Sequence, residues 1–384
     1  MTATFFQRVV LPGFILQSVL IGGGYATGRE LVEFFLSSGP LGGLFGIVAA
    51  TVMFSAISMV SFELARMTHS YSYRRFFQGL LGRGWFIYEL AYMALGILVL
   101  AVIGSAAGNV AAEHLQIPAS VGTVALMVAI CVLVAWGTKL IEKVLAGWSF
   151  LLYVVYGVFV WFYLDQFGGS LSEQLSEGTV ESDWLVNAVK YVGYNIAALP
   201  LILFCVRHMK GRKDALLAGS LAGPLAMIPA LVFYLAMVAG SDQVAGAAVP
   251  SDFMMQQLDQ PWLQAIFYVV LFGTFVETGT AFVHAMNERI AEVYEEKQQQ
   301  MSAKLRLGIA AAVLILSVYL ASSIGLVGLI GGGYGTLTWI FVAVFVVPVM
   351  TLGVYRVFVQ SHGQPFVVSD QTSTSEGVKN TETV

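Results

Sequence analysis

The sequence predicts an all-α integral membrane protein whose ten transmembrane helices form two inverted repeats of five. Three observations predict this class. The 384 residues are 58% hydrophobic and only 11% charged. The chain contains a series of long apolar stretches, each near the length of about 20 residues that crosses a bilayer. The first and sixth stretches are interrupted by glycine, asparagine or proline, so we expect helices 1 and 6 to be discontinuous.

The composition excludes several classes of protein. A soluble domain carries about a quarter charged residues, and no soluble fold of this size can hide so much apolar surface. The net charge of −4 provides no basic surface for a nucleic acid. Cys131 and Cys205 both lie inside apolar stretches, which excludes a disulfide framework. The lipid bilayer is therefore the expected partner of most of the surface, and no nucleic-acid partner is expected.

Ten apolar stretches are long enough to be spans. They differ from the alternating strands of about ten residues that build a membrane β-barrel. No small-residue cleavage site follows the N-terminal stretch, so we expect it to be retained as the first span. Residues 359–384 are polar and rich in Ser, Thr and Glu, which predicts a disordered cytoplasmic tail. The spans are expected at 6–36, 42–65, 85–110, 120–136, 144–164, 184–206, 214–239, 261–287, 305–322 and 335–358.

The positive charges predict the orientation of the spans. All Lys and Arg residues except Arg29 and Lys190 lie near the two termini or in the connections after spans two, four, six and eight. The connections after spans three, five, seven and nine contain none. Cytoplasmic connections carry the excess of Lys and Arg. Both termini are therefore expected to be cytoplasmic, in a multi-pass protein of the cell (plasma or inner) membrane.

Arg29 and Lys190 each lie inside a span, one in the first and one in the sixth. Their positions divide the chain into two halves of five spans, residues 1–165 and 183–358, within one integrated membrane domain. Because five is an odd number, the second half inserts upside down relative to the first, as in transporters built from inverted repeats. A charge inside a span is costly and usually faces a cavity or an opposite charge.

Glycine interrupts the first span, where residues 22–30 read GGGYATGRE. Each glycine costs roughly 1 kcal/mol of helix stability relative to alanine. Thr27, followed three residues later by Glu30, forms a capping box that marks the start of a new helix. The break lies about 14 residues, or ~21 Å, beyond Arg8 and therefore near the bilayer centre. The alternative is an unbroken helix whose glycines pack against a neighbouring helix.

The sixth span contains a matching interruption. Gly193, Asn195 and Pro200 lie within eight residues of one another. Pro200 cannot donate to the carbonyl group of Ile196, and Asn195 can cap a restarting helix. Gly193 lies about 14 residues before Arg207, so both breaks have the same depth. A simple proline kink explains the sixth span alone, but the pairing of the two breaks favours a transporter.

Two broken helices at one depth predict a binding site at the middle of the bilayer. Irregular backbone is tolerated there only where it is buried in protein or lines a cavity. Free N–H groups at the restarting half-helix suit a carboxylate, and free carbonyl groups before the breaks suit a cation such as Na⁺. Tyrosines at the breaks could close over a solute, although aromatic residues in spans more often serve packing. The candidate solute-binding residues are Gly22, Gly23, Gly24, Tyr25, Ala26, Thr27, Gly28, Tyr191, Tyr194 and Asn195.

Several motifs resemble those of the YkvI-type membrane proteins, occur in the same order and span most of residues 6–358. Gly23 and Tyr25 depart from the Ala and Phe expected there. That family is similar to the amino acid–polyamine–organocation superfamily, whose fold is the LeuT-like bundle of five plus five helices. The resemblance implies a secondary transporter and leaves its substrate open. The matching segments are residues 22–30 with Glu33-Phe34-Phe35, Tyr191 to Asn195, Glu277-Thr278-Gly279, Asn287 to Ile290, and Gly325-Leu326-Val327 ahead of Gly333-Tyr334.

The eighth span contains a carboxylate at Glu277. Helical spacing places His284 and Glu288 on the same face. This stripe could relay protons, or Glu277 could balance a bound cation. The alternative is a structural pairing of Glu277, with His284 at the cytoplasmic rim. In LeuT-like transporters the eighth helix donates hydroxyl groups to a sodium site, and this resemblance makes Thr274 and Thr278 the candidates.

The remaining charges in the membrane suggest a gate or an ion pair. Arg29 is a candidate outer gate residue, and Glu30 or Glu33 could neutralise Lys190 where the first and sixth helices meet. A single fixed ion pair between half-helices is the alternative, and for Glu30 the capping role is a sufficient explanation. Residues 331–336 resemble the first glycine motif but lie at the wrong place for the inverted repeat. We therefore expect a turn there, between spans nine and ten.

These observations predict an ion-coupled secondary transporter of a small, polar, amino-acid-like solute. It needs no cofactor beyond Na⁺ or H⁺ as the coupling ion. A membrane enzyme would need a nucleophile with its base, or a metal cluster; the five His residues are scattered, and neither an enzyme nor a metal site is predicted. No Walker-type phosphate loop is present in the sequence. The alternative function is a non-transporting membrane sensor or assembly protein that retains the transporter fold.

Overall fold

Most of the part that the structure describes is helical. The computed structural model describes residues 3–136, 138–240, 242–296 and 298–359, so the predicted tail lies outside these residues apart from Val359. Within them, eight helices are long and apolar enough to cross a membrane. Two shorter apolar helices, Phe6–Leu20 and Ala119–Ala135, occupy the predicted first and fourth spans. This architecture is that of a multi-pass membrane protein.

The helices follow the predicted spans to within a few residues at most boundaries. The helices at the predicted second to ninth spans are α4 (Pro40–Met67), α6 (Trp85–Leu115), α7 (Ala119–Trp136), α8 (Thr138–Phe167), α10 (Trp184–Asn195) with η5 (Ile196–His208), α11 (Arg212–Ala239), α14 (Pro261–Glu296) and α15 (Ala303–Ile324). Shorter helices lie between them: η2 (Leu36–Ser38), α5 (Tyr73–Leu81), η3 (Gly82–Gly84), η4 (Gly168–Ser170), α9 (Leu171–Ser176), α12 (Asp242–Gly246) and α13 (Pro250–Gln257).

The first span is divided into short helices, which are η1 (Phe6–Val10), α1 (Leu11–Leu20), α2 (Gly23–Ala26) and α3 (Arg29–Phe34). Ile21 leaves helical geometry with φ −79° and ψ 66°. Gly28 has a left-handed φ of 76°. Glycine is needed there because L-residues rarely adopt this conformation and because a Cβ would clash with Met237. Helical geometry is therefore broken at two places between α1 and α3.

The sixth span changes helix type at its middle. α10 passes at Asn195 directly into η5, a 3-10 helix of 13 residues that contains Pro200. Runs of 3-10 helix longer than about four residues are uncommon, so the second part of this span departs from α-helical geometry without a gap. The Asn195 side chain donates to the carbonyl group of Tyr191 at 3.0 Å. The expectation that Asn195 caps a restarting helix is therefore wrong, because its amide is bonded back into α10.

The tenth span begins earlier than predicted. It contains α16 (Leu326–Gly328), η6 (Leu329–Tyr334), α17 (Gly335–Phe341), η7 (Val342–Val346), η8 (Val349–Gly353) and α18 (Val354–Phe358). The prediction of a turn at residues 331–336 is wrong, since this segment is helical. Its glycines instead allow close packing. A Cβ at Gly331 would lie 2.6 Å from Glu33 Oε1, and one at Gly333 would lie 2.8 Å from Leu98 Cδ1.

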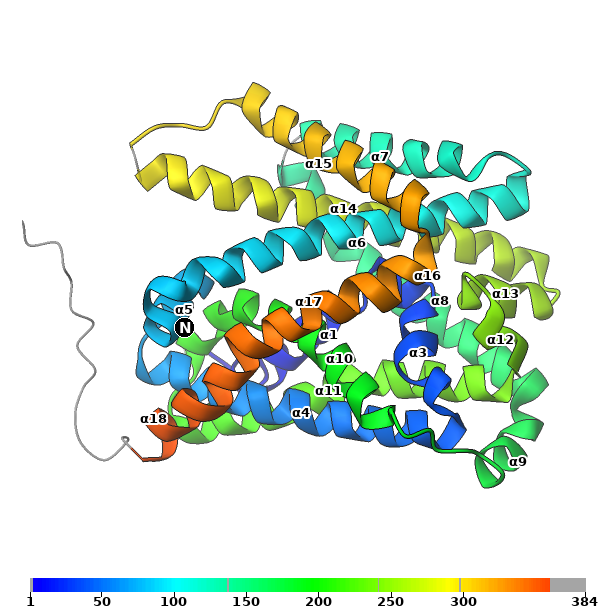
Figure 1. The fold of residues 1–384 in the computed structure, drawn as a ribbon, viewed down its shortest axis with the longest axis horizontal. Coiled ribbons are helices and arrows are strands. Elements are labelled where there is room, and N and C mark those ends of the chain that lie inside the picture. Colours follow the sequence, from blue (N-terminus) through cyan, green and yellow to red (C-terminus); the bar gives the residue numbers. More distant parts are fainter. Residues whose placement is uncertain (1–2, 137, 241, 297, 360–384) are drawn as a thin grey trace, which may run out of the picture.

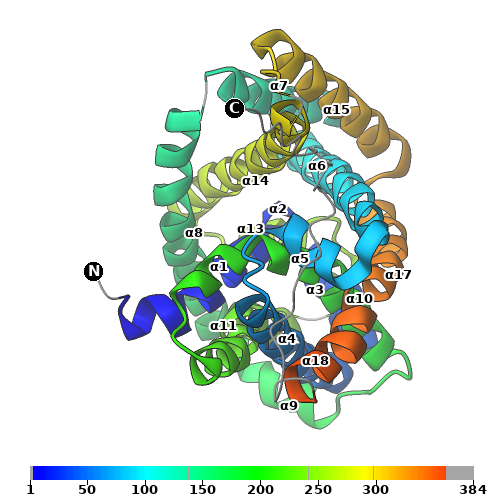
Figure 2. The same ribbon diagram turned by 90° about the vertical axis from the view of Figure 1, so that its left-hand side faces the viewer.

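The first and sixth spans lie at the centre of the bundle. Figure 2 shows α1, α2, α3 and α10 surrounded by α4, α11, α8, α14, α6 and α17. In Figure 1, α7 and α15 lie beyond α6 and α14, on the outside of the bundle. α4 and α11 approach so closely that a Cβ at Gly223 would clash with the carbonyl group of Thr51. Small residues commonly permit such contacts between membrane helices.

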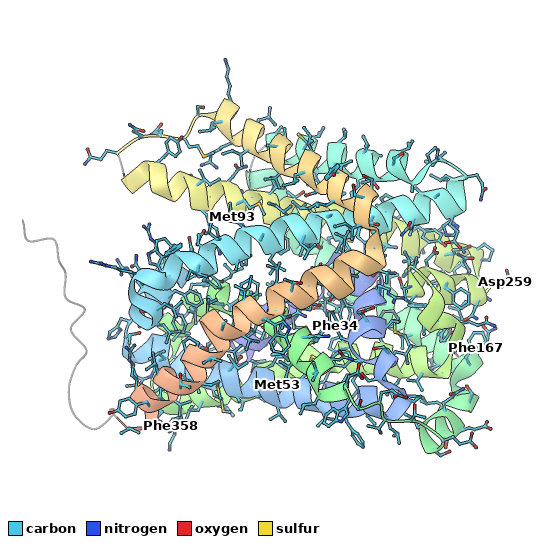
Figure 3. The ribbon with its side chains drawn as sticks, viewed as in Figure 1. Phe34, Met53, Met93, Phe167, Asp259 and Phe358 are labelled. Carbon is cyan, nitrogen blue, oxygen red and sulfur yellow. The ribbon has the colours of Figure 1, made fainter. Side chains whose placement is uncertain are left out.

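Polar side chains join segments at the end of the bundle that holds Phe358 (Figure 3). Arg212, at the start of α11, lies 4.9 Å from the Phe358 ring. Arg8 pairs with Asp214 at 2.5 Å, and Arg356 donates to a carbonyl group of α5 at 2.9 Å. The basic segments that the sequence predicts to be cytoplasmic thus lie together at one end. Which side of a membrane this end faces stays a prediction.

Candidate functional site

A small cavity lies beside the break in the first span. Its volume is about 60 Å³, enough for about four to six water molecules at 10–15 Å³ each. Its lining comes from the first, third, sixth, eighth and tenth spans. The lining residues are Val19, Leu20, Gly22, Gly24 and Glu30, then Tyr92, Leu95 and Val99, then Tyr194, Asn195 and Ala198, then Thr278 and Phe282, and finally Tyr334.

Glu30 supplies the carboxylate of this cavity. The residue is only 5% exposed, and Tyr194 donates a hydrogen bond to its Oε2 at 2.5 Å. Its Oε1 lies against Gly24, where a Cβ would clash with it. The predicted capping box is wrong, because Glu30 turns toward Tyr194. The N–H group of Arg29 donates to Thr27 Oγ1 at 3.2 Å instead.

Tyr334 is a cavity residue that sequence reasoning missed. Its ring stacks on the ring of Tyr194 at 4.4 Å between centroids and 18° between planes. The stack holds the hydroxyl group of Tyr194 beside Glu30. The repeated Gly-Gly-Gly-Tyr motif at residues 331–334 was the available signal. The sequence predicts a turn there, because the motif does not fit the symmetry of an inverted repeat.

The three tyrosines predicted to close over a solute have different surroundings. Tyr194 lines the cavity. Tyr191 packs in the core, with its ring centroid 4.8 Å from that of Phe35. Tyr25 lines a second, apolar cavity of about 170 Å³ between the first span, α8 and α11, together with Tyr156. Of these tyrosines, the structure brings Tyr194 to the cavity that contains the carboxylate.

The backbone at the break is already bonded to protein groups. The Ala26 carbonyl group accepts a hydrogen bond from Tyr156, and the Gly24 carbonyl group accepts one from Thr27 at 2.6 Å. The carbonyl group of Thr27 accepts from the N–H group of Ser251 at 2.9 Å. The sequence suggested that free carbonyl groups here would suit a cation, but these three accept hydrogen bonds from the protein.

Of the candidate ion-coupling residues on α14, Thr278 lines the cavity and Thr274 does not. Thr274 is buried and donates its hydroxyl group to a carbonyl group of its own helix at 2.8 Å. A Cβ at Gly22 would lie 3.5 Å from Thr278 Cγ2. Glu277 is half-buried and interacts electrostatically with Tyr153 of α8. The three residues therefore do not converge on one point.

Arg29 and Glu33 form an ion pair within α3, at 3.2 Å. Arg29 also donates to the carbonyl groups of Ala245 and Ala247 at 3.0 and 3.2 Å, so it ties α3 to the end of α12 and to the connection that follows it. Glu30 and Glu33 thus bond to Tyr194 and Arg29, not to Lys190 as suggested. A gating role for Arg29 stays a prediction.

A polar cluster joins α13 to α6 and α14 near the end marked by Asp259 in Figure 3. His114 Nε2 lies 2.9 Å from Asp252 Oδ1, and Tyr268 donates to the same oxygen at 2.6 Å. Burial raises the pKa of the Asp252 carboxyl group, although the hydrogen bonds from Tyr268 and His114 partly oppose this. The cluster thus anchors α13, whose Ser251 N–H group donates to the carbonyl group of Thr27. No local pattern in the sequence relates His114 to a residue so far along the chain.

Arg289 contacts the ring of Tyr92 but does not line the cavity. Its guanidinium group is 3.9 Å from the Tyr92 centroid and 4.1 Å from the Tyr73 centroid, and it donates to Glu89 at 2.8 Å. His284, one turn earlier on α14, is 4.0 Å from the exposed Glu288. Within the described residues, no three His, Cys, Asp or Glu side chains are placed to hold a metal ion.

No protein-family model matches the sequence. YkvI of Bacillus subtilis strain 168, an uncharacterized membrane protein, is 24% identical to it over 319 residues, which are 81% of this chain and 87% of YkvI. The chain is a distant relative of the YkvI-type membrane proteins. The resemblance that the motifs indicated is thereby confirmed.

Solved structures show the fold. MhsT in complex with L-phenylalanine matches with a TM-score of 0.56 and 14% identity, over 89% of this chain and 88% of MhsT. Inward-facing Mhp1 matches with a TM-score of 0.57 and 13% identity, over 90% of this chain and 76% of Mhp1. A Na⁺-coupled sialic acid symporter matches with a TM-score of 0.50 and 12% identity, over 89% of this chain and 85% of the symporter. The chain therefore has the LeuT-like fold of these membrane transporters.

Proposed function

We propose that the chain is an ion-coupled secondary transporter that moves a small, polar, amino-acid-like solute by alternating access. The solute site is the cavity between the first, sixth and eighth spans. The ten spans form two inverted halves, helices 1 and 6 are discontinuous, and both termini are cytoplasmic in the cell membrane. The observation that carries the proposal is the buried Glu30 carboxylate, which lines a cavity at the point where α1 ends.

The fold and the cavity support this proposal in separate ways. Solved structures of the same fold include proteins named as a Na⁺-coupled symporter and as a manganese transporter. A charged residue inside a membrane protein is costly and usually lines a solute or ion pathway. The cavity carries such a residue, and its walls come from both proposed halves of the chain. Movement of one half against the other would therefore open it to one side or the other.

The coupling ion is Na⁺ or H⁺. Glu30 and Thr278 both line the cavity. In this proposal Glu30 would carry the proton, or the hydroxyl group of Thr278 would contribute to a Na⁺ site. Glu277 lies outside the cavity lining and would act from a separate position near Tyr153. Coupling to Na⁺ predicts that a Na⁺ gradient drives solute uptake, and coupling to H⁺ predicts that a pH gradient drives it. The rival function, a non-transporting sensor or assembly protein with the same fold, predicts binding without movement of solute.

The test is uptake by purified protein in sealed vesicles. Radiolabelled amino acids and amines are supplied outside, with a Na⁺ gradient, a pH gradient or no gradient. We expect accumulation of at least one solute above the level in protein-free vesicles, and dependence on one of the two gradients. Equal uptake with and without both gradients would contradict ion coupling. Binding of a solute that never accumulates would instead establish the sensor.

A further inference from the structure

We propose that the cavity binds the ammonium group of a small organic amine, with Glu30 as its counter-ion. This proposal rests on the transport function above and names the class of solute for the same site. It differs from the expectation that a solute carboxylate binds at the start of the half-helix. Three features of the site support it: the position of the Glu30 carboxylate, the aromatic rings in the cavity wall, and the bonding of the backbone at the start of α3.

The Glu30 carboxylate gives the cavity its charge. Its Oε2 accepts from Tyr194, and its Oε1 lies over Gly24. The lining, which consists of described residues, includes no Lys, Arg or His. Arg29 is adjacent to Glu30 in sequence but pairs with Glu33 at 3.2 Å. A buried carboxylate is costly without a cation, and an ammonium group in the cavity would supply one.

Two other cationic residues lie near the cavity without lining it. Lys190 is one helical turn before Tyr194 and is absent from the lining. Arg289 contacts the Tyr92 ring at 3.9 Å, is absent from the lining and is paired with Glu89 at 2.8 Å. Neither of these cations is placed to neutralise the carboxylate in the cavity, so the negative charge remains available to a ligand.

Aromatic rings form much of the remaining wall. Tyr194 and Tyr334 are stacked at 4.4 Å, and the rings of Tyr92 and Phe282 lie 6.1 Å apart. All four line the cavity. The face of an aromatic ring is electrically negative and attracts cations. A carboxylate among aromatic rings therefore favours an ammonium ion and disfavours a solute carboxylate.

The start of α3 is a poor site for a solute carboxylate. The N–H group of Arg29, the first residue of α3, donates to Thr27 Oγ1 at 3.2 Å and is therefore not free for a solute. α3 has only six residues, and Glu30 lies in its first turn. The negative charge of Glu30 opposes the weak positive end of so short a helix.

The cavity volume sets the size of the probe. About 60 Å³ corresponds to roughly four to six non-hydrogen atoms, if each takes the space of one water molecule. Propylammonium, propionate and 1-propanol share one carbon chain and are respectively positive, negative and neutral. A comparison of the three therefore separates recognition of charge from recognition of size.

The test measures thermal stability of the purified full-length protein with each of these three compounds, because a ligand that binds the folded state raises the unfolding temperature. We expect propylammonium to raise it, and propionate and 1-propanol to leave it unchanged. Glu30→Gln should weaken propylammonium binding by about tenfold or more, and Glu30→Asp, which keeps the charge, by less. Glu173→Gln, which removes an exposed carboxylate of α9, is the matched control and should bind as the wild type does.

Several outcomes overturn the proposal. It fails if propylammonium has no effect on the wild type, if propionate stabilises the protein equally well, or if Glu30→Gln binds propylammonium unchanged. Its failure is distinguishable from failure of the transport proposal. If a carboxylate solute without an amine accumulates in vesicles, transport stands and the amine class is wrong. If propylammonium binds through Glu30 but no solute accumulates, the amine site stands and transport is wrong.

Discussion

Replacing Arg289 with Gln is expected to lower the free energy of unfolding by about 3 kcal/mol. Arg289 is 7% exposed and pairs with Glu89 at 2.8 Å. The substitution leaves that carboxylate without its cation and removes contacts with the rings of Tyr73 and Tyr92. Because Tyr92 also lines the cavity, we expect solute binding to weaken as well. Unfolding of the purified protein in detergent measures the first effect.

A second ion pair of the same chemistry provides the control for this substitution. Arg306 pairs with Glu288 at 2.5 Å, but their side chains are 35% and 47% exposed. Arg306→Gln should therefore cost about 1 kcal/mol or less. The double variant Glu89→Gln with Arg289→Gln should recover part of the loss, because neither charge is then left alone. Equal losses from the two arginine substitutions would show that the buried pair contributes nothing beyond an exposed one.

Replacing Gly24 with Ala is expected to weaken solute binding by about ten- to a hundredfold. The new Cβ would occupy the space of Glu30 Oε1 and force the carboxyl group away from Tyr194. A hydrogen bond to a charged group contributes about 1.5–3 kcal/mol, and each 1.4 kcal/mol corresponds to about a factor of ten in affinity. Binding of propylammonium by thermal shift or calorimetry measures the change.

Gly22 provides the comparison for Gly24. A Cβ at Gly22 would lie 3.5 and 3.6 Å from Thr278 Cγ2 and Oγ1, which is ordinary contact. Gly22→Ala should therefore cause a much smaller loss of affinity than Gly24→Ala. If both variants lose a similar amount of affinity, any added volume at the break weakens binding, and the position of the Glu30 carboxylate is not the cause.

The positions of the spans could be predicted from the sequence, because span length and apolar composition are set by the bilayer itself. The predicted stretch at 184–206 became α10 and η5, and that at 214–239 became α11. The glycines at 22–24 directly follow the end of α1 at Leu20, and the discontinuity of this helix in the membrane stays a prediction. Each of these features depends on the residues of one segment and on the bilayer around it. A local sequence pattern is therefore sufficient to predict them.

The partners of the charged side chains could not be predicted in the same way. Glu30 was assigned to a local capping box, yet it bonds to Tyr194, which is 164 positions along the chain. Tyr334 stacks on Tyr194 from the tenth span, and His114 of α6 contacts Asp252 of α13. Such contacts depend on which helices are neighbours in the bundle. Spacing within one helix predicts only neighbours three or four residues apart.

The most direct test of the central claim is the accessibility of the cavity from each side of the membrane. Ala198 lines the cavity, and Ala198→Cys in a background of Cys131→Ala and Cys205→Ala gives one reactive thiol. A membrane-impermeant maleimide is applied to right-side-out and to inverted vesicles, with and without propylammonium and a Na⁺ or pH gradient. We predict labelling from both sides, with the ligand and the gradient shifting the balance between them. Labelling from one side only under every condition, or no labelling at all, would contradict alternating access.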